Sequence, residues 1–369
     1  MNIPAKPFLN INLFKRTLPK LDEFGLLYLN SGTAAVLKAL MILDPEKKCT
    51  IILPALICAT VPQAIKDAGF KIFYVDSQIH SIWPSLESYS NCLKADGSYI
   101  IVLIEFFGAE VPYFGKLERM CKAFNCRFII DRCHSCLTRA NYDEQVDAIA
   151  RSYRKTLPLP SIGSVETRCK FEKIEVSKIS FKSVKFFVSQ LCYDVLFRVF
   201  KNKMSLYPMV DFLKRIKVRR YGHPRFTNKN THKLKYVDYF FKDIVSNSLY
   251  LDKCKEVRKY NLVCYQNGLE MYDCPVEFSN SNVPQVYPIS ARSNDIRGKV
   301  DYAPELRKMG IGAFNWPGEE LPFDVINNPS LPNALVWSSN VVCLPLHQSI
   351  HPSDLRTIIQ AVKSLRLSG

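Results

Sequence analysis

Strand-like and helix-like segments alternate along residues 34–131, and this alternation most constrains what the chain can fold into. Strand-like apolar runs lie at 50–53, 71–76, 99–106 and 127–131, and helical patterns lie at 34–43, 59–68 and 116–124. The run at 99–106 does not alternate with polar residues, which is typical of a strand buried on both faces. Strands separated by helices predict βαβ units around a mainly parallel sheet. The expected fold class is therefore α/β, with helices flanking a central sheet.

The length of 369 residues allows a large domain and a smaller one. A content of 47% hydrophobic and 23% charged residues excludes a disordered, collagen-like or coiled-coil chain. Residues 168–260 are basic, aromatic and mostly helical in pattern, strand character returns near 284–288, and residues 352–365 form an amphipathic helical pattern. We expect a large domain at 1–250, which includes a basic helical segment at 168–250, and a small C-terminal α/β domain at 251–369.

Composition also bears on the compartment. The longest apolar run, near 99–107, is interrupted by Glu105 and has about half the ~20 residues of a membrane span. The basic residues Lys6, Lys15 and Arg16 are not followed by the apolar stretch of a secretory signal. The 13 cysteines are odd in number, and many lie in apolar runs, which favours free thiols in a reducing compartment. We expect a cytoplasmic protein.

Four of these cysteines offer a zinc site as an alternative. Cys133-x-x-Cys136 has a suitable spacing, and Cys121, Cys126 and His134 are close in sequence. The two cysteine pairs lack a regular knuckle pattern, however, and residues 127–131 between them are needed as a core strand. Structural thiols are therefore favoured over zinc binding or redox chemistry, and no metal is expected. A metal assay on purified protein decides between these.

A helix start and two charged side chains carry the candidate chemistry. Asn30-Ser31-Gly32-Thr33 opens a helix, where first-turn N–H groups and two hydroxyls can hold a phosphate, or Ser31 can act only as an N-cap. Asp131 ends an apolar strand, where it can pair with a protonated ring nitrogen or cap a helix. Lys155 precedes Pro158 and Pro160 in a stiff loop that would hold its amine in place, although a lone lysine is usually a solvated surface group.

The order of these pieces resembles the DegT/StrS family of nucleotide-sugar aminotransferases, which are fold type I enzymes that use pyridoxal 5'-phosphate (PLP). The matching pieces are Ser31-Gly32-Thr33-Ala34-Ala35, Leu53-Pro54-Ala55, Ala64-Ile65, Ala68-Gly69, Val75-Asp76, Phe107-Gly108, Ile130-Asp131 with His134, Ser152-Tyr153-Arg154-Lys155, Arg258-Lys259-Tyr260-Asn261, Gly310-Ile311, Trp316-Pro317 and Leu344-Pro345-Leu346-His347. No single piece is very specific, but their order over more than 300 residues is. The Ser-x-Arg-Lys-Thr-Leu-Pro form is similar to a less studied branch of the family.

The resemblance implies roles for individual residues. Lys155 would carry PLP as a Schiff base and shuttle protons, and Asp131 would pair with the pyridine nitrogen. His134 would lie at the 3-oxygen of the ring, and Trp316 on the substrate side. The residues implied to bind the phosphate or face the ring are Ser31, Gly32, Thr33, Cys58 and Ser152.

Three features depart from the family's usual pattern. Cys58 stands where an aromatic residue often stacks on the ring. Gly163 is followed by Ser164, where a second glycine is common, and the interval from Ser152 to Lys155 is shorter than usual. These departures weaken any inference about the substrate.

The function implied by the resemblance is transfer of an amino group, from glutamate as the family's usual donor, to a keto-sugar. A nucleotide-linked sugar is expected, for the biosynthesis of a surface polysaccharide or a secondary metabolite, and a homodimer is expected by analogy. The alternatives are a PLP-dependent sugar dehydratase, whose members place histidine at the lysine position, and a non-catalytic scaffold. The presence of Lys155 argues against the first, and that of Lys155 with Asp131 against the second.

Residues 168–260 hold most of the chain's net charge of +16, with 23 Lys and Arg against 8 Asp and Glu. A phosphate-bearing substrate would explain part of this surplus, with Arg219 and Arg220 as candidate substrate-binding residues. The alternatives are peripheral contact with an anionic membrane and a helix that packs on the core or on a dimer partner. Nucleic acid is not expected, because no recognised module is present.

Overall fold

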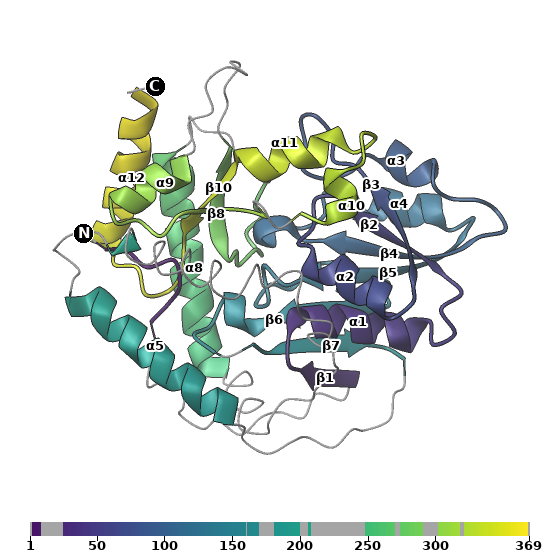
Figure 1. The fold of residues 1–369 in the computed structure, drawn as a ribbon, viewed down its shortest axis with the longest axis horizontal. Coiled ribbons are helices and arrows are strands. Elements are labelled where there is room, and N and C mark those ends of the chain that lie inside the picture. Colours follow the sequence, from purple (N-terminus) through teal and green to yellow (C-terminus); the bar gives the residue numbers. More distant parts are fainter. Residues whose placement is uncertain are drawn as a thin grey trace.

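The computed structural model describes residues 2–8, 25–159, 161–169, 181–199, 206–207, 248–269, 274–290, 302–317 and 321–367. A seven-stranded sheet forms the larger part (Figure 1), with strand order β1-β7-β6-β5-β4-β2-β3. Its strands are β1 (Gly25–Leu29), β2 (Thr50–Pro54), β3 (Lys71–Val75), β4 (Ser98–Ile104), β5 (Asn125–Arg132), β6 (Ala148–Ser152) and β7 (Gly163–Thr167). Strands β2 to β6 are parallel, and β7 is antiparallel to both of its neighbours. The predicted fold class, a mainly parallel sheet flanked by helices, is confirmed.

Helices cover both faces of this sheet, and the strand sequence explains how. In β4, Ile100 and Val102 pack with α1 (Gly32–Leu43) and α2 (Thr60–Asp67), whereas Ile101 packs with α3 (Leu86–Ser90) and α4 (Phe114–Cys121). Successive side chains of a strand point to opposite faces, so a strand buried on both sides needs apolar residues at every position. The unbroken apolar run therefore marks β4 as a central strand, as expected.

Two predicted elements had boundaries that were wrong by a few residues. The strand expected at 99–106 ends at Ile104, because the chain turns into the short 3-10 helix η2 (Phe106–Gly108). Phe107 and Gly108 have positive φ angles there, 57° and 106°, and a Cβ on Gly108 would lie 2.7 Å from the Cα of Pro284. The helix expected at 116–124 begins at Phe114 and ends at Cys121.

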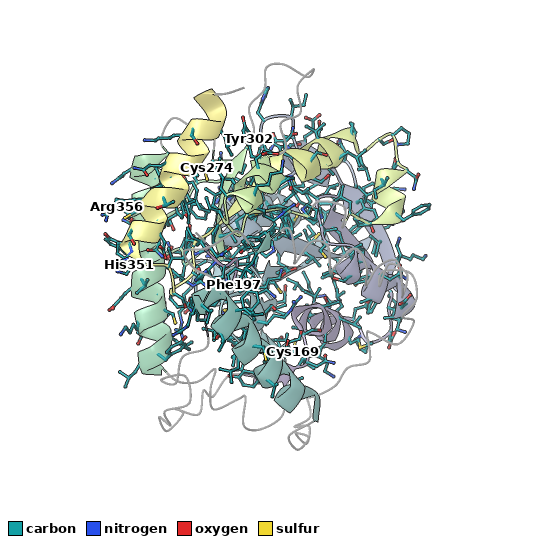
Figure 2. The ribbon with its side chains drawn as sticks, turned by 60° about the vertical axis from the view of Figure 1, so that its left-hand side comes forward. Cys169, Phe197, Cys274, Tyr302, His351 and Arg356 are labelled. Carbon is teal, nitrogen blue, oxygen red and sulfur yellow. The ribbon has the colours of Figure 1, made fainter. Side chains whose placement is uncertain are left out.

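A second, three-stranded sheet lies in the C-terminal part, with order β8-β10-β9. It consists of β8 (Val286–Ser290), β9 (Phe314–Asn315) and β10 (Val341–Pro345), and it shares an apolar cluster with α8 (Ser248–Gly268), α9 (Tyr302–Lys308) and α12 (Pro352–Leu367). Figure 2 shows α12, marked by Arg356, beside α8, in agreement with Figure 1. The predicted strand near 284–288 and the final helix at 352–365 are confirmed within these bounds.

Two other C-terminal helices pack on the first sheet. The Asp76 carboxylate, just after β3, accepts hydrogen bonds from the backbone N–H groups of Asn333 and Ala334, both at 2.9 Å, at the start of α11 (Pro332–Asn340). Lys66 of α2 pairs with Asp324 of α10 (Phe323–Ile326). The two parts are thus closely joined, and the division into domains at 1–250 and 251–369 stays a prediction.

Helix α5 (Phe181–Val199) forms as its periodicity predicts, but its apolar face is turned outward. Val188, Leu191, Val195 and Val199 are each more than half exposed, whereas Phe197 is buried against Tyr207. These four side chains therefore do not pack on the core, which excludes one of the two packings expected for this face. None of the described helices is long and apolar enough to cross a membrane.

Candidate active site

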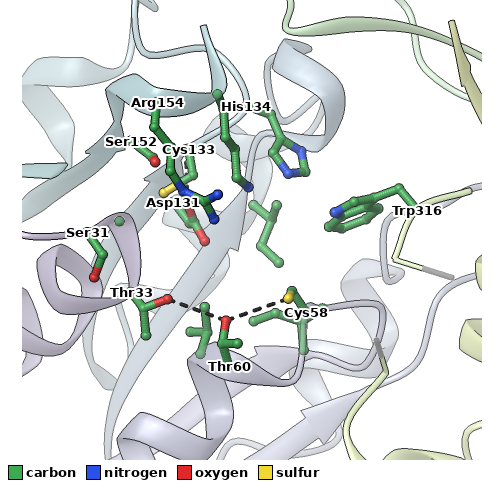
Figure 3. A pocket seen from close by; sticks show the side chains of 15 residues that line it. Ser31, Thr33, Cys58, Thr60, Asp131, Cys133, His134, Ser152, Arg154 and Trp316 are labelled. Carbon is green, nitrogen blue, oxygen red and sulfur yellow. Dashed lines mark hydrogen bonds between the residues drawn. The ribbon is translucent and has the colours of Figure 1, made fainter. Parts of the chain in front are cut away.

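The candidate active site is a pocket at the carboxyl ends of β4, β5 and β6, where the first turns of α1 and α2 also arrive (Figure 3). Ligands of open α/β sheets bind at this edge, because the strand ends and helix N-termini meet there. The residues that line it are Ser31, Gly32, Thr33, Ile57, Cys58, Thr60, Val61, Ile104, Asp131, Cys133, His134, Ser152, Arg154, Lys155 and Trp316. The structure thus brings together every site residue named from the sequence except Arg219 and Arg220, which lie outside the described residues.

The start of α1 forms a close-fitting cradle. Ser31 caps the helix, with its Oγ accepting a hydrogen bond from the Ala34 backbone N–H at 3.1 Å. A Cβ on Gly32 would lie 2.5 Å from Cys133 Sγ and 2.8 Å from Ser152 Cβ, so only glycine fits between the helix and the strand ends. The first amides of a helix have no acceptor within it and can bind an anion. Capping and anion binding are therefore compatible here.

Thr33 connects the cradle to α2. Its Oγ1 lies 3.4 Å from the Thr60 Oγ1, and Thr60 opens α2 two residues after Cys58. Cys58 Sγ lies 3.6 Å from the same Thr60 hydroxyl. Thr60 was missed by the sequence reasoning, although its place at the start of the helix predicted for 59–68 would have suggested it.

Asp131 occupies the buried end of β5. Its side chain is 7% exposed, and its Oδ1 accepts a hydrogen bond from the Cys133 backbone N–H at 3.0 Å. Burial, with the neighbouring Asp131, raises the pKa of the Cys133 thiol well above its ordinary value, so this cysteine stays protonated. No other carboxylate is found among the described residues that line the pocket.

His134 is held as a neutral ring. Burial, assisted by the nearby Lys155, holds its pKa well below the ordinary value. Its Nδ1 accepts a hydrogen bond from the Phe107 backbone N–H at 3.1 Å, so the proton of the neutral ring is on Nε2. The ring stacks on Phe107 at 5.8 Å between centroids, and Trp316 stands edge-on to it at 4.7 Å.

Lys155 ends the 3-10 turn η4 (Tyr153–Lys155) that follows β6 and is half-buried. The residues after it are fixed from two sides. Leu157 is buried, and its N–H donates to the Tyr153 carbonyl at 2.8 Å. Arg258 of α8, itself fully buried, donates to the Thr156 carbonyl at 2.9 Å and to the Pro284 carbonyl at 2.8 Å. The stiff loop expected around Lys155 is thus anchored mainly by Arg258, which the sequence reasoning did not foresee.

The departures from the family pattern have local explanations. A Cβ on Gly163 would lie 2.3 Å from the Ser31 carbonyl oxygen, so this single glycine lets β7 approach the cradle. Ser164 fits at the next position, where its Oγ lies 3.2 Å from the Tyr153 hydroxyl. Cys58 lines the pocket at the position where an aromatic side chain was expected, beside Ile57 and Val61.

The cysteines considered for zinc do not form one site. Cys121 packs in the cluster beneath α3 and α4, with Cys126 against it, whereas Cys136 lies in a separate cluster with Tyr153 and Leu157. Within the part of the chain that the structure describes, no group of three or more His, Cys, Asp or Glu residues is arranged to hold a metal ion. The zinc alternative therefore has no support from the arrangement of these residues.

Comparison with known proteins agrees with the resemblance seen in the sequence. Residues 25–151 match the model of the DegT/DnrJ/EryC1/StrS aminotransferase family, which confirms over these residues the resemblance seen in the motifs. No curated protein sequence is significantly similar to the chain.

Solved structures share the fold over nearly the whole chain. The putative sugar aminotransferase Spr1654 of Streptococcus pneumoniae, in its PLP form, has a TM-score of 0.61 at 17% identity, covering 92% of this chain and 86% of that one. NtdA of Bacillus subtilis, with bound PMP, has a TM-score of 0.65 at 15% identity, covering 92% and 72%. PseC of Helicobacter pylori, an aminotransferase of pseudoaminic acid biosynthesis, has a TM-score of 0.63 at 15% identity, covering 93% and 87%.

Proposed function

We propose that this chain, whose residues 25–151 are those of the DegT/DnrJ/EryC1/StrS aminotransferase family, is a PLP-dependent aminotransferase that acts on a keto-sugar. One observation carries the proposal. Lys155, Asp131 and the N-terminal cradle of α1 come from three separate elements and converge on one pocket. A lysine amine, a buried carboxylate and a set of anion donors are the groups that PLP requires.

The pocket fits the cofactor by two structural criteria. The Gly32 position is a cradle that any Cβ would fill, next to the Ser152 hydroxyl and the first amides of α1. Asp131 is a buried carboxylate whose Oδ1 accepts the Cys133 N–H, and a carboxylate has about four acceptor sites, so it has lone pairs left for a protonated ring nitrogen. Ser31, Gly32, Thr33 and Ser152 would hold the phosphate, with Cys58 and His134 near the ring.

Bound PLP would supply an electron sink for the bond that breaks at the substrate carbon. Lys155 would hold the aldehyde and then carry a proton at its Nζ between substrate positions. Asp131 would keep the ring nitrogen protonated by its negative charge. His134, neutral with its proton on Nε2, can donate a hydrogen bond without adding charge. Trp316, edge-on to His134, would form the wall on the substrate side.

We further propose a nucleotide-linked keto-sugar as the acceptor and glutamate as the donor, for glycan or secondary-metabolite biosynthesis. The structures that share the fold include a putative sugar aminotransferase, Spr1654, and PseC, an aminotransferase described as acting in pseudoaminic acid biosynthesis. The surplus of basic residues at 168–260, which includes Arg219 and Arg220, suits an acceptor that carries phosphates. A dehydratase is disfavoured because Lys155, and not a histidine, occupies the position of the cofactor lysine in the pocket.

The test is chemical trapping of the cofactor. Purified protein should be yellow after addition of PLP, and borohydride should fix the cofactor irreversibly on Lys155, as read by peptide mass spectrometry. Lys38 of α1, which is half-buried and does not line the pocket, serves as the control lysine and should remain unmodified. Protein that stays colourless with added PLP contradicts the enzyme assignment. Modification at a lysine other than 155 contradicts the assignment of the residue.

A cytoplasmic homodimer with a face toward anionic membranes is the proposed setting. The exposed Val188, Leu191, Val195 and Val199 form an apolar stripe on α5, within the basic region of the chain. Sedimentation equilibrium measures the molar mass in solution, and a fully active monomer excludes the dimer.

Binding to vesicles with and without phosphatidylserine measures the membrane contact. Binding that survives a Leu191→Ser and Val195→Ser double substitution means that the stripe is not the contact.

A further inference from the structure

Arg154 is a cation of the pocket whose charge is not used by the fold. It lies between the proposed phosphate residue Ser152 and the proposed cofactor lysine, on the turn η4. Its side chain is exposed, lines the pocket and points into it (Figure 3). Among the described residues it has no carboxylate within ion-pair distance and no hydrogen-bond acceptor.

The other arginines near this edge of the sheet are engaged. Arg132 is bound by Glu105 and Asp143 at 2.7 and 2.6 Å, and Arg151 is paired with Glu166 at 2.5 Å. Arg258 donates to three backbone carbonyls, one of them that of Thr156. Each of these guanidinium groups therefore has a structural role. Arg154, in the same neighbourhood, has no such partner in the part of the chain that the structure describes.

The charges that line the pocket show what Arg154 is suited to bind. Asp131 is the one carboxylate there, Lys155 and Arg154 are the two cations, and the buried His134 is neutral. In the proposed function the Lys155 amine would be occupied by the cofactor aldehyde, and the Asp131 carboxylate would face the ring nitrogen. Arg154 is then the full positive charge left for a ligand. A guanidinium binds a carboxylate or a phosphate through two parallel hydrogen bonds.

We propose that Arg154 is an anion-binding residue of the active site, which binds an oxyanion carried either by the amino-acid donor or by the cofactor. The inference rests on the proposed function, because it assigns Lys155 and Asp131 to the cofactor. The two oxyanions, a donor carboxylate and the cofactor phosphate, share the same chemistry. They are separated by which ligand loses affinity when the guanidinium is removed.

The experiment compares wild-type protein with Arg154→Ala and Arg154→Lys by equilibrium titration. Cofactor-free protein is titrated with PLP and with pyridoxal, which lacks the phosphate, and PLP-loaded protein is titrated with L-glutamate. Loss of a charged hydrogen-bond pair should weaken the affected ligand by about 10-fold or more. If Arg154 binds the phosphate, Arg154→Ala weakens PLP and spares pyridoxal. If Arg154 binds the donor, Arg154→Ala weakens the affinity for L-glutamate and leaves the affinity for PLP unchanged. Arg154→Lys should retain part of the affinity, because lysine keeps the positive charge but cannot form the two parallel hydrogen bonds of a guanidinium.

Arg139 provides the matched control, because it is an exposed arginine of the same region that does not line the pocket. Arg139→Ala should leave all three affinities unchanged, and thermal melting should show that every variant folds. Arg154→Ala with all affinities within about twofold of wild type overturns the inference. Wild-type protein that binds no PLP overturns the proposed function instead. Inorganic phosphate and glutarate are also titrated calorimetrically into wild-type protein and the same variants. Anion binding by Arg154 is therefore measured even if the protein binds no PLP.

Discussion

Replacing Asp131 with asparagine is expected to lower the turnover of the aminotransferase half-reaction by at least about 100-fold, the scale of losing a preorganised electrostatic contact. Asparagine keeps an oxygen to accept the Cys133 N–H but removes the negative charge. Without that charge the ring nitrogen of bound PLP loses its proton and becomes a poor electron acceptor. Single-turnover absorbance changes on addition of L-glutamate measure the loss directly.

Alanine at the same position should be at least as damaging, even where some PLP is still bound. The matched control is Asp147→Asn. Its carboxylate lies at the start of β6, where it accepts the Phe128 N–H at 2.7 Å, and does not line the pocket. That variant should retain turnover after correction for any loss of folded protein. An Asp131→Asn protein with near wild-type turnover would mean that a different acid serves the ring nitrogen.

Replacing Arg132 with methionine is expected to lower the free energy of unfolding by about 3–5 kcal/mol, the cost of leaving a buried charge unpaired. Arg132 and Glu105 are both fully buried and share two hydrogen bonds, at 2.8 and 2.7 Å, and Asp143 binds the same guanidinium. Burial alone would lower the pKa of Arg132, but the adjacent carboxylates outweigh it and raise the pKa. Urea denaturation of wild type and variant measures the difference.

A second substitution distinguishes the contribution of the ion pair from the cost of leaving the Glu105 charge unpaired. In Arg132→Met with Glu105→Leu both charges are gone, so much of the stability should return. The Ser135 and Tyr142 hydroxyls, which donate to Glu105, would then limit the recovery. Arg139→Met, at an exposed site, should change stability by less than about 0.5 kcal/mol. A loss below about 1 kcal/mol in Arg132→Met would show that the network contributes little to folding.

The sequence predicts the frame of this protein better than the contacts within it. The unbroken apolar run of β4 reveals a strand buried on both faces, because that property depends on local residues alone. The Glu105–Arg132 pair could not be predicted, because it joins residues 27 positions apart on neighbouring strands. The early end of β4 has the same origin, since the turn at Phe107 is fixed by contacts with His134 and Pro284.

The candidate site follows the same division. Ser31, Asp131 and Lys155 could be named from strand ends, helix starts and family motifs, and the structure brings them into one pocket. Their roles stay predictions until a cofactor is trapped. Arg154 could be named from the sequence as the neighbour of Lys155, but its place on the pocket wall, with no ion-pair partner among the described residues, is seen only in the structure. Helix α5 illustrates the opposite error, since periodicity finds the apolar face but not the direction in which it points.

Arg258 has a mechanical consequence for the whole molecule. Its guanidinium, carried by α8, is bonded to the carbonyl after Lys155 and to the carbonyls of Pro284 and Gln285 that lead into β8. The buried Arg258 side chain therefore connects three stretches of main chain that are distant in sequence: α8, the turn after Lys155 and the segment before β8. The C-terminal helices cannot swing away from the lysine turn as a separate rigid body without breaking these bonds in a place that water does not reach. Displacement of α8 is thereby transmitted to the turn that carries the Lys155 amine.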